Sequence, residues 1–262
     1  MAMKLTLLFL FSSILNAQNE ATAELLQQDM KAAREHVERL ESSVPNFICN
    51  EQIVLRVFSK QKLKKETRAE SMLTTIRVTK GNQIRFDESR TQMRIDGKPS
   101  GMNRVAEPFA WGDGPAYSAL HYLFASETGA TCMEHKLMGP VKLDGRDAIL
   151  LETSAPHDIR SDERCSDLRS ESADRIWLDP QTMNVIRVES HDPPVTIEPD
   201  DELTLTVEYA PVSFDGTEYW LPSHFTSRLD FPGTTRHLQY EAFFTDYHKY
   251  GAESTFHVDP DQ

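Results

Sequence analysis

Nine histidines are the side chains of this sequence best suited to metal binding or proton transfer. None of them stands in an H-E-x-x-H or H-x-H pattern, the short spacings that bring two imidazoles to one metal ion. His121 lies in an apolar stretch, where a hydrogen-bonded core histidine is the commoner outcome. The sequence therefore predicts no metal site and no cofactor.

A nucleophilic or phosphate-binding site is not indicated either. Ser118 and His121 are spaced as neighbours on a helix, but no G-x-S-x-G elbow and no orienting acid accompany them. In the stretch GDGPAY, Pro115 removes a backbone donor, and no Lys-Ser or Lys-Thr follows. The acidic stretches at 158–167 and 198–202 lack the spacing of a calcium loop. We therefore predict that the chain has no catalytic residues and is not an enzyme.

The start of the chain has the pattern of a secretory signal. Lys4 supplies a positive charge, residues 5–15 form an apolar run, and Ala17 is a small residue after it. The run is shorter than the ~20 residues that cross a bilayer. A buried N-terminal helix or an uncleaved anchor is the alternative. We predict that residues 1–17 are removed by cleavage near Ala17 and that the protein is periplasmic or secreted.

The three cysteines, Cys49, Cys132 and Cys165, would then lie in an oxidising compartment, where an odd number leaves one thiol over. Cys132 falls in an expected strand and Cys165 in a polar loop two elements later, so a Cys132–Cys165 disulfide is the favoured pairing. A bond between Cys49 and Cys132 is the alternative. None of the three has the nearby His or the C-x-x-C partner of a catalytic thiol.

Length and charge limit the class of protein. The 262 residues suit one large domain better than two, and the formal net charge is −13. Such acidity excludes the basic face that nucleic acids require, and it disfavours adsorption to anionic lipid. Like charge also keeps copies of the chain apart. We expect a monomer whose membrane contacts are transient.

Apolar periodicity predicts a helical start, residues 18–45, followed by one β domain over residues 46–262. Residues 23–40 place apolar side chains at helical spacing, so this amphipathic helix needs the rest of the domain to cover it. Beyond it the period becomes two, the pattern of half-buried strands. Turn dipeptides separate these runs: Gly81-Asn82, Asp96-Gly97 and Asp144-Gly145.

The number and order of these runs predict the fold class. Ten to twelve strands without βαβ alternation favour a mainly β (α+β) fold, with one strongly curved antiparallel sheet or half-open β-barrel. A short middle helix is expected at 116–125 in addition to the N-terminal helix, and a last strand at 254–258.

A curved sheet has a concave face, and apolar residues that the two helices leave uncovered would make that face a binding groove. The loop and helix in the middle of the chain supply candidates for its rim, and later strands supply candidates for its wall. The rim candidates are Phe109, Trp111, Leu120, Leu123 and Phe124, and the wall candidates are Leu205, Val207, Tyr209, Phe225 and Leu229. The alternative is that the helices fill the face and that these residues are ordinary core.

One hairpin carries a resemblance to a known family. Residues 176–188, IWLDPQTMNVIRV, join a strand ending in Asp-Pro-x-Thr to a strand of the type Val-Ile-Arg-Val. With the exported start and the helix before the meander, this resembles the periplasmic lipoprotein-carrier superfamily, half-barrel proteins related to the outer-membrane lipoprotein-sorting chaperone. The segments VPNFICNEQ (44–52) and YHKYGAEST (247–255) are similar to secreted acidobacterial proteins. The resemblance implies a half-barrel that shields a lipid chain, with a lipidated protein as one kind of partner.

Three functions are therefore open. The first is binding of a lipid, an acyl chain or another apolar small molecule in the concave face. The second is an envelope sensor or scaffold that binds a protein segment with the same surface, and the third is a hydrolase with a dispersed site. An open aliphatic groove favours the first, and a filled interior with an exposed sheet edge favours the second. A buried histidine near a carboxylate in a polar cleft favours the third.

Overall fold

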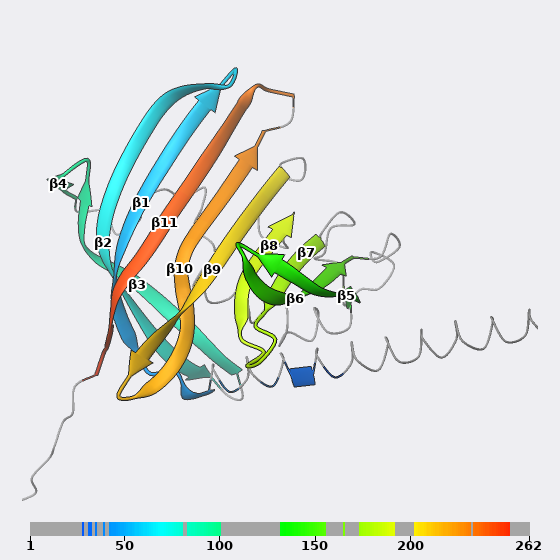
Figure 1. Cartoon of the computed structure of the whole chain (residues 1–262). Helices are drawn as coiled ribbons and strands as arrows, with labels where there is room; N and C mark the ends of the chain where they lie inside the picture. The colour runs from blue at the N-terminus through cyan, green and yellow to red at the C-terminus, as the bar shows by residue number, and fades with distance from the viewer. Residues whose placement is uncertain are drawn as a thin grey trace, which may run out of the picture.

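The computed structural model describes residues 28, 31–32, 35, 39, 42–80, 83–100, 132–155, 165, 173–191, 202–231 and 233–251. Together they form one antiparallel sheet of 11 strands and part of an N-terminal helix (Figure 1). The strands are β1 (Phe47–Ser59), β2 (Lys62–Lys80), β3 (Gln83–Ile95), β4 (Lys98–Pro99), β5 (Glu134–Leu143), β6 (Arg146–Ser154), β7 (Ala173–Leu178), β8 (Val185–His191), β9 (Glu202–Phe214), β10 (Thr217–Asp230) and β11 (Arg236–Lys249).

The sheet is a meander with one pairing, in its middle, between strands that are distant in sequence. Its strand order is β4-β3-β2-β1-β11-β10-β9-β8-β7-β6-β5, so only β1 and β11 are neighbours in space without being neighbours in sequence. That pairing runs from Phe47 opposite Lys249 to Ser59 opposite Arg236. The long strands β2, β1, β11, β10 and β9 curve side by side, and the shorter β5–β8 continue the sheet beyond them (Figure 1). The sheet is open, with β4 and β5 at its two edges.

Two-residue turns with positive φ at both positions set the register of four hairpins. Three of them are Asp-Gly pairs, in which glycine adopts positive φ without a steric penalty. These pairs are Asp96-Gly97, Asp144-Gly145 and Asp215-Gly216. The fourth turn is Lys60-Gln61, between β1 and β2, where neither residue is glycine or asparagine. Thr235 accepts a hydrogen bond at its carbonyl from the Lys60 amide at 3.0 Å, which ties this turn to the strand beyond.

The N-terminal helix ends at a fixed point on the sheet. Its described residues are Gln28, Lys31, Ala32, Glu35, Arg39, Ser42 and Ser43. The hydroxyls of Ser42 and Ser43 donate to the carbonyl of Arg39 at 2.9 and 2.6 Å, which satisfies an acceptor that the last turn leaves over. Arg77 of β2 donates its guanidinium to the Ser42 carbonyl, and so β2 holds the end of the helix.

The expected fold class is confirmed, since the chain forms a single open antiparallel sheet of 11 strands. The hairpin at 176–188 forms as predicted, with Asp179 accepting hydrogen bonds at its carboxylate from the amides of Gln181 and Thr182 at 3.0 and 2.9 Å. The middle helix at 116–125, the strand at 254–258 and the signal at 1–17 lie outside the described residues. Within the described part of the chain, none of the helices reaches the length and apolar character that crossing a membrane requires.

Candidate functional site: the inner face of the sheet

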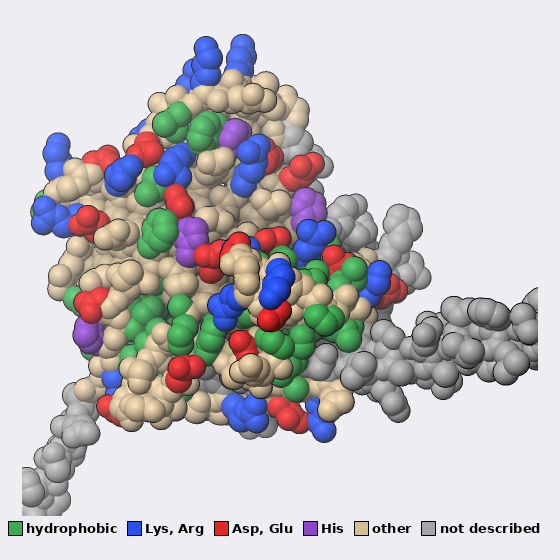
Figure 2. Space-filling model, viewed as in Figure 1, with side chains coloured by type: hydrophobic (Ala, Val, Ile, Leu, Met, Phe, Trp, Pro, Cys, Tyr) green, Lys and Arg blue, Asp and Glu red, His purple; other side chains and the backbone are tan. Residues whose placement is uncertain are grey.

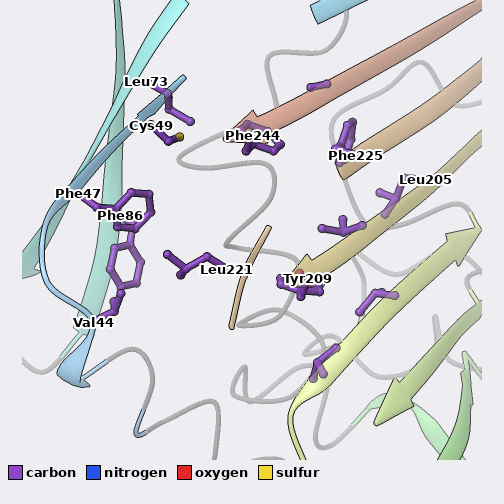
Figure 3. Packing of buried hydrophobic residues seen from close by; sticks show 14 of the residues in the cluster. Val44, Phe47, Cys49, Leu73, Phe86, Leu205, Tyr209, Leu221, Phe225 and Phe244 are labelled. Carbon is purple, nitrogen blue, oxygen red and sulfur yellow. The ribbon is translucent and has the colours of Figure 1, made fainter. Parts of the chain in front are cut away.

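One face of the sheet, here called the inner face, carries an unbroken row of apolar side chains. Its members lie directly opposite one another from β5 to β2, because each pairs in register with the next. This apolar row consists of Leu137, Leu151, Ile176, Val188, Val207, Phe225, Ala242, Ile53 and Ala69. All of them except Leu137 are buried. Figure 3 shows that labelled side chains from β1–β3 and from β9–β11 point into the same interior.

The next row towards the start of β9 is polar. Its members pair in register over seven strands on the same face, and each lies two residues from the member of the apolar row in its own strand. This polar row consists of His135, Thr153, Asp174, Ser190, Leu205, Ser227 and Tyr240. Beyond it the face becomes apolar again with Leu203, Leu229 and Leu238, which form a cluster of their own. The polar row is therefore a band between two apolar zones.

A cavity follows the polar row. Over β5 to β9 its volume is about 780 Å³, and its lining residues fall into groups of three centred on His135, Thr153, Asp174, Ser190 and Leu205. A second part of about 300 Å³ is centred on Leu205, Ser227 and Tyr240 and shares residues 204–206 with the first. In both parts most of the lining residues are the outward-pointing neighbours of the row, among them Arg175, Arg56 and Glu241, and none belongs to the apolar zones of the inner face. Both parts therefore open on the opposite, outer face of the sheet, over the backbone of the polar row.

Asp174 is the charged residue of this row. It is 5% exposed, and its Oδ2 accepts a hydrogen bond from the Thr153 hydroxyl at 2.9 Å. Burial raises the pKa of Asp174 to about 6, a rise that the hydroxyls of Ser190 and Thr153 oppose. Within the described part of the chain no Lys, Arg or His forms an ion pair with it. Asp174 is therefore a buried carboxyl group that accepts its hydrogen bond from a neutral hydroxyl, that of Thr153.

A second buried acid lies on the same face, in β1. Glu51 is 1% exposed, and Arg90 of β3 grips both its oxygens, with Nε–Oε2 and Nη2–Oε1 distances of 2.7 and 2.8 Å. The Ser71 hydroxyl adds a bond of 2.7 Å to Oε2. Burial opposes the charge of Arg90, but the bonds and charge of Glu51 outweigh it and raise the arginine pKa above its usual range. Arg90 therefore supplies the positive charge that pairs with Glu51.

The three cysteines form one disulfide and one free thiol. Cys132 and Cys165 form a disulfide with Cα atoms 5.7 Å apart, so the favoured pairing is correct and the Cys49–Cys132 alternative is not formed. The bond packs with Ala155 beside the β5 and β6 ends that line the cavity. Cys49 is a free, buried thiol near Glu51. Burial, aided by the charge of Glu51, raises its pKa to about 12, which removes the thiolate that a reactive cysteine needs.

The predicted wall residues all lie on the inner face, but they do not form an open greasy groove. Leu205, Val207, Tyr209, Phe225 and Leu229 are each at most 5% exposed. Leu205, Val207, Tyr209 and Phe225 belong to the main core cluster, and Leu229 belongs to the cluster beside it. That these residues contact a ligand stays a prediction from the sequence. The predicted rim residues Phe109, Trp111, Leu120, Leu123 and Phe124 lie outside the described residues.

The sequence interpretation missed Asp174 and Glu51, although a signal for both was present. Asp174 occupies the inward position of an alternating strand, two residues before Ile176, and Glu51 does the same two residues before Ile53. In a strand whose alternate residues are apolar and point inward, a charged residue at one of those alternate positions must also point into the interior. His135 was weighed only for tight ligand spacing, and the described residues include no group of His, Cys, Asp and Glu that could hold a metal.

The outer face carries charge in another arrangement. Starting at β2, a chain of charged and hydrogen-bonded side chains crosses the sheet to the β5–β6 turn, with the His224 ring between two glutamates. Its members are Glu66, Arg56, Glu241, His224, Glu208, Arg187 and Asp144. Figure 2 shows basic, acidic and histidine side chains gathered on the face seen there. Arg56 and Glu241 are 28% and 25% exposed, so solvent screens this network. We assign this outer-face network to the pairing of neighbouring strands and not to the candidate functional site.

Comparison with solved structures finds distant matches. The chain is similar to a DUF1329 family protein from Desulfovibrio piger, at 12% identity and a TM-score of 0.42, over 86% of this chain and 95% of that one. It is also similar to an outer membrane lipoprotein-sorting protein domain from Vibrio parahaemolyticus (15%, 0.40, 85% and 92%). A third match is a LolA superfamily protein from Nitrosomonas europaea (9%, 0.36, 87% and 94%). No protein-family model and no curated protein matches the chain.

Proposed function

We propose that this chain binds an apolar or amphipathic small molecule, such as a lipid or an acyl chain, on the inner face of its sheet. The observation that carries the proposal is the apolar row, which runs in register over nine strands from β5 to β2. An apolar surface of this extent can take a hydrocarbon chain out of water.

Binding alone is sufficient as an activity. Burying ~14 methylenes at ~0.8 kcal/mol each is worth ~11 kcal/mol before ordering costs, so an apolar chain needs no covalent step to be held. His135 and Asp174 belong to the same row of the inner face, but Thr153 lies between them, which separates the imidazole from the carboxylate. A hydrolase requires these groups in contact, and we therefore propose a binding protein and not an enzyme.

We place the protein in the periplasm or outside the cell. The Cys132–Cys165 disulfide supports this proposal, because such bonds persist in oxidising compartments. Export through cleavage near Ala17 remains a prediction from the sequence, and sequencing the N-terminus of the secreted chain tests it.

The proposal can be tested by adding bulk to the inner face. Leu205 of β9 points into that face beside Val207 of the apolar row, so Leu205→Trp adds bulk there. The matched control is Thr206→Trp, which adds the same bulk to the outer face of the same strand. Binding of the neutral fluorescent probe N-phenyl-1-naphthylamine should fall at least tenfold in the first variant and stay within twofold in the control.

Native mass spectrometry of the wild-type chain from a bacterial periplasm provides an independent measurement. We expect an added mass that denaturation releases as a lipid. Absence of both the added mass and probe uptake by the wild-type chain would overturn the proposal, as would full probe binding by Leu205→Trp.

The second candidate function, binding of a protein segment, is favoured by a different observation. The edge strand β5 pairs with β6 on one side, and no described strand pairs with its other side. A free edge of ten residues can accept an extended peptide by strand addition. If Lys142→Pro, which removes a backbone donor in β5, abolished partner capture in cells while wild-type protein took up no probe, this second function would replace the first.

A further inference from the structure

The turn between β1 and β2 and the loop between β10 and β11 meet at one end of the sheet (Figure 1). The strands β1 and β11 pair as far as Ser59 and Arg236. Beyond them the Lys60 amide donates a hydrogen bond to the Thr235 carbonyl at 3.0 Å, so the two connections are held together. All residues of this structure except Ser59 are exposed. The structure, here called the tip, consists of residues 59–65 and 233–236.

The charge of the tip is opposite to that of the whole chain. The formal net charge of the sequence is −13, yet the tip contains no Asp or Glu. Within the described part of the chain none of its lysines forms an ion pair, and the first acid beyond it, Glu66, is held by Arg56 and Arg68. Figure 2 shows basic side chains projecting from this end of the molecule. The basic residues of the tip are Lys60, Lys62, Lys64, Lys65 and Arg236.

Two acids lie in the next row of the sheet, and one of them already has its countercharge. Asp230 of β10 lies opposite Glu202 of β9, one position behind the tip. Arg228 donates to both oxygens of Asp230, at 2.5 and 2.7 Å, and these bonds hold the pKa of Asp230 below its usual value. Even with Glu202 counted in full, the five cations of the tip are in excess.

Leu63 places an apolar side chain among these cations. It is 50% exposed, the largest exposed fraction among the large hydrophobic residues of the described chain. It lies opposite Phe58, and Lys62 and Lys64 flank it in β2. An apolar side chain between lysines suits the boundary of a bilayer, where the charges meet phosphates and the side chain enters the edge of the hydrocarbon.

The backbone of the turn keeps a lysine where glycine or asparagine is usual. Lys60 and Gln61 have φ values of 51° and 59°, whereas the three comparable turns of the sheet end in glycine. A side chain other than Gly, Asn or Asp rarely adopts this conformation, because it costs free energy. Such a cost is expected where the lysine side chain itself is needed.

We infer that the tip docks the protein on the surface of a bilayer that contains anionic phospholipids. The inference goes beyond the proposed function, since docking requires no ligand on the inner face. Each Lys or Arg close to an anionic bilayer strengthens binding about fivefold. The attraction decays within a Debye length of ~8 Å at physiological salt, and a strand rises ~3.3 Å per residue, so acids deeper in the sheet lie beyond its range. The overall negative charge therefore sets the orientation of docking, with the tip towards the bilayer.

Flotation of the intact protein with lipid vesicles tests the inference. Vesicles of phosphatidylcholine alone are compared with vesicles in which roughly a third of the lipid is phosphatidylglycerol. The wild type should bind the anionic vesicles at least tenfold more tightly in ~0.1 M salt and lose this preference in ~1 M salt. Lys62→Gln with Lys64→Gln should weaken anionic binding at least tenfold. The matched control, Lys98→Gln with Lys136→Gln, removes two exposed lysines outside the tip and should change it less than twofold.

Two single variants separate docking from folding. Asparagine tolerates positive φ, so Lys60→Asn should not lower the thermal stability, while anionic binding should weaken about fivefold. Leu63→Gln should weaken binding at least threefold, whereas Met138→Gln, at another exposed apolar position, should not.

Equal binding of neutral and anionic vesicles by the wild type would overturn the inference, as would undiminished binding by the Lys62 and Lys64 double variant. Displacement from the vesicles by soluble polyglutamate at matched charge would also overturn it, because an acidic protein segment would then be the better partner. None of these measurements involves the inner face, so their failure leaves the proposed function standing.

Discussion

The two buried acids of the inner face are buried to a similar degree, but they have different hydrogen-bond partners. Glu51, in the region of β1–β3, is held by both arms of Arg90 and by Ser71. Asp174, in the region of β6–β8, has only neutral hydroxyls beside it. Both are at most 5% exposed. The difference is therefore not one of burial but of whether the chain supplies the opposite charge.

A buried charge without a partner destabilises the fold. Glu51 and Arg90 thus hold the region of β1–β3 together, whereas Asp174 lowers the stability of the region of β6–β8 whenever its carboxyl group is charged.

The largest expected effect comes from removing the countercharge of Glu51. Arg90→Met should lower the free energy of unfolding by about 3–5 kcal/mol, because it leaves the Glu51 carboxylate buried and unpaired. Urea unfolding near pH 7 measures this. The double variant Glu51→Gln with Arg90→Met should recover most of the loss, since both charges are then gone. A loss below about 1 kcal/mol in the single variant would show that the pair is not what holds this region.

We expect the Cys132–Cys165 disulfide to stabilise the region of β5 and β6, as the Glu51–Arg90 pair stabilises the region of β1–β3. Replacing both Cys132 and Cys165 by serine should lower stability by about 3–4 kcal/mol, the chain-entropy value for a loop of 33 residues. The same change should weaken probe binding, because the bond lies beside the ends of β5 and β6, two strands that carry the apolar row. Unfolding and probe titration on the same samples report both effects. Unchanged probe affinity at full loss of stability would separate the bond from the site.

Asp174→Asn should make the protein more stable, in contrast to Arg90→Met. The folded chain raises the pKa of Asp174 to about 6 from an ordinary 3.8, so it favours the protonated form. The stability that this proton contributes is fully present below about pH 4 and is lost as pH rises through about 6. Asparagine resembles the protonated acid at all pH values. The variant should therefore gain on the order of 3 kcal/mol near pH 8 and nothing near pH 4.

Thermal unfolding of the two proteins at both pH values, without ligand, measures this gain. Equal stabilities near pH 8 would mean that the acid is already compensated in the free protein, and the contrast with Glu51 would then disappear.

The smallest effect is expected on the outer face. Arg56 bonds Glu66 at 3.1 Å and Glu241 at 2.9 Å, much as Arg90 bonds Glu51, but it is 28% exposed. Arg56→Met should cost less than about 1 kcal/mol, because solvent already screens these charges. It is the matched arginine control for Arg90→Met in urea unfolding. Equal losses in the two variants would show that burial does not distinguish the two faces.

The features predicted correctly from the sequence are those that local residues determine. Asp96-Gly97 and Asp144-Gly145 specify their turns, and the hairpin around Asp179 follows from Asp-Pro chemistry. The turn at Lys60-Gln61 was missed, since neither residue is a usual turn former and its positive φ values are held by the sheet around it.

The candidate site was predicted only in part, because it depends on pairings between distant residues. Alternation in β9 places Leu205 on the inner face, and that prediction is correct. The polar row exists because seven strands align in one register, which no single strand specifies. In the same way, the segment around Asp174 does not reveal that no distant arginine reaches it, while Glu51 finds one 39 residues away.

The most direct test of this account is a crystal structure of the protein with 12-bromododecanol, located by the anomalous signal of its bromine. The account predicts the bromine among the apolar side chains of the inner face. An inner face filled by the protein's own side chains, with the ligand bound elsewhere or not at all, would contradict it.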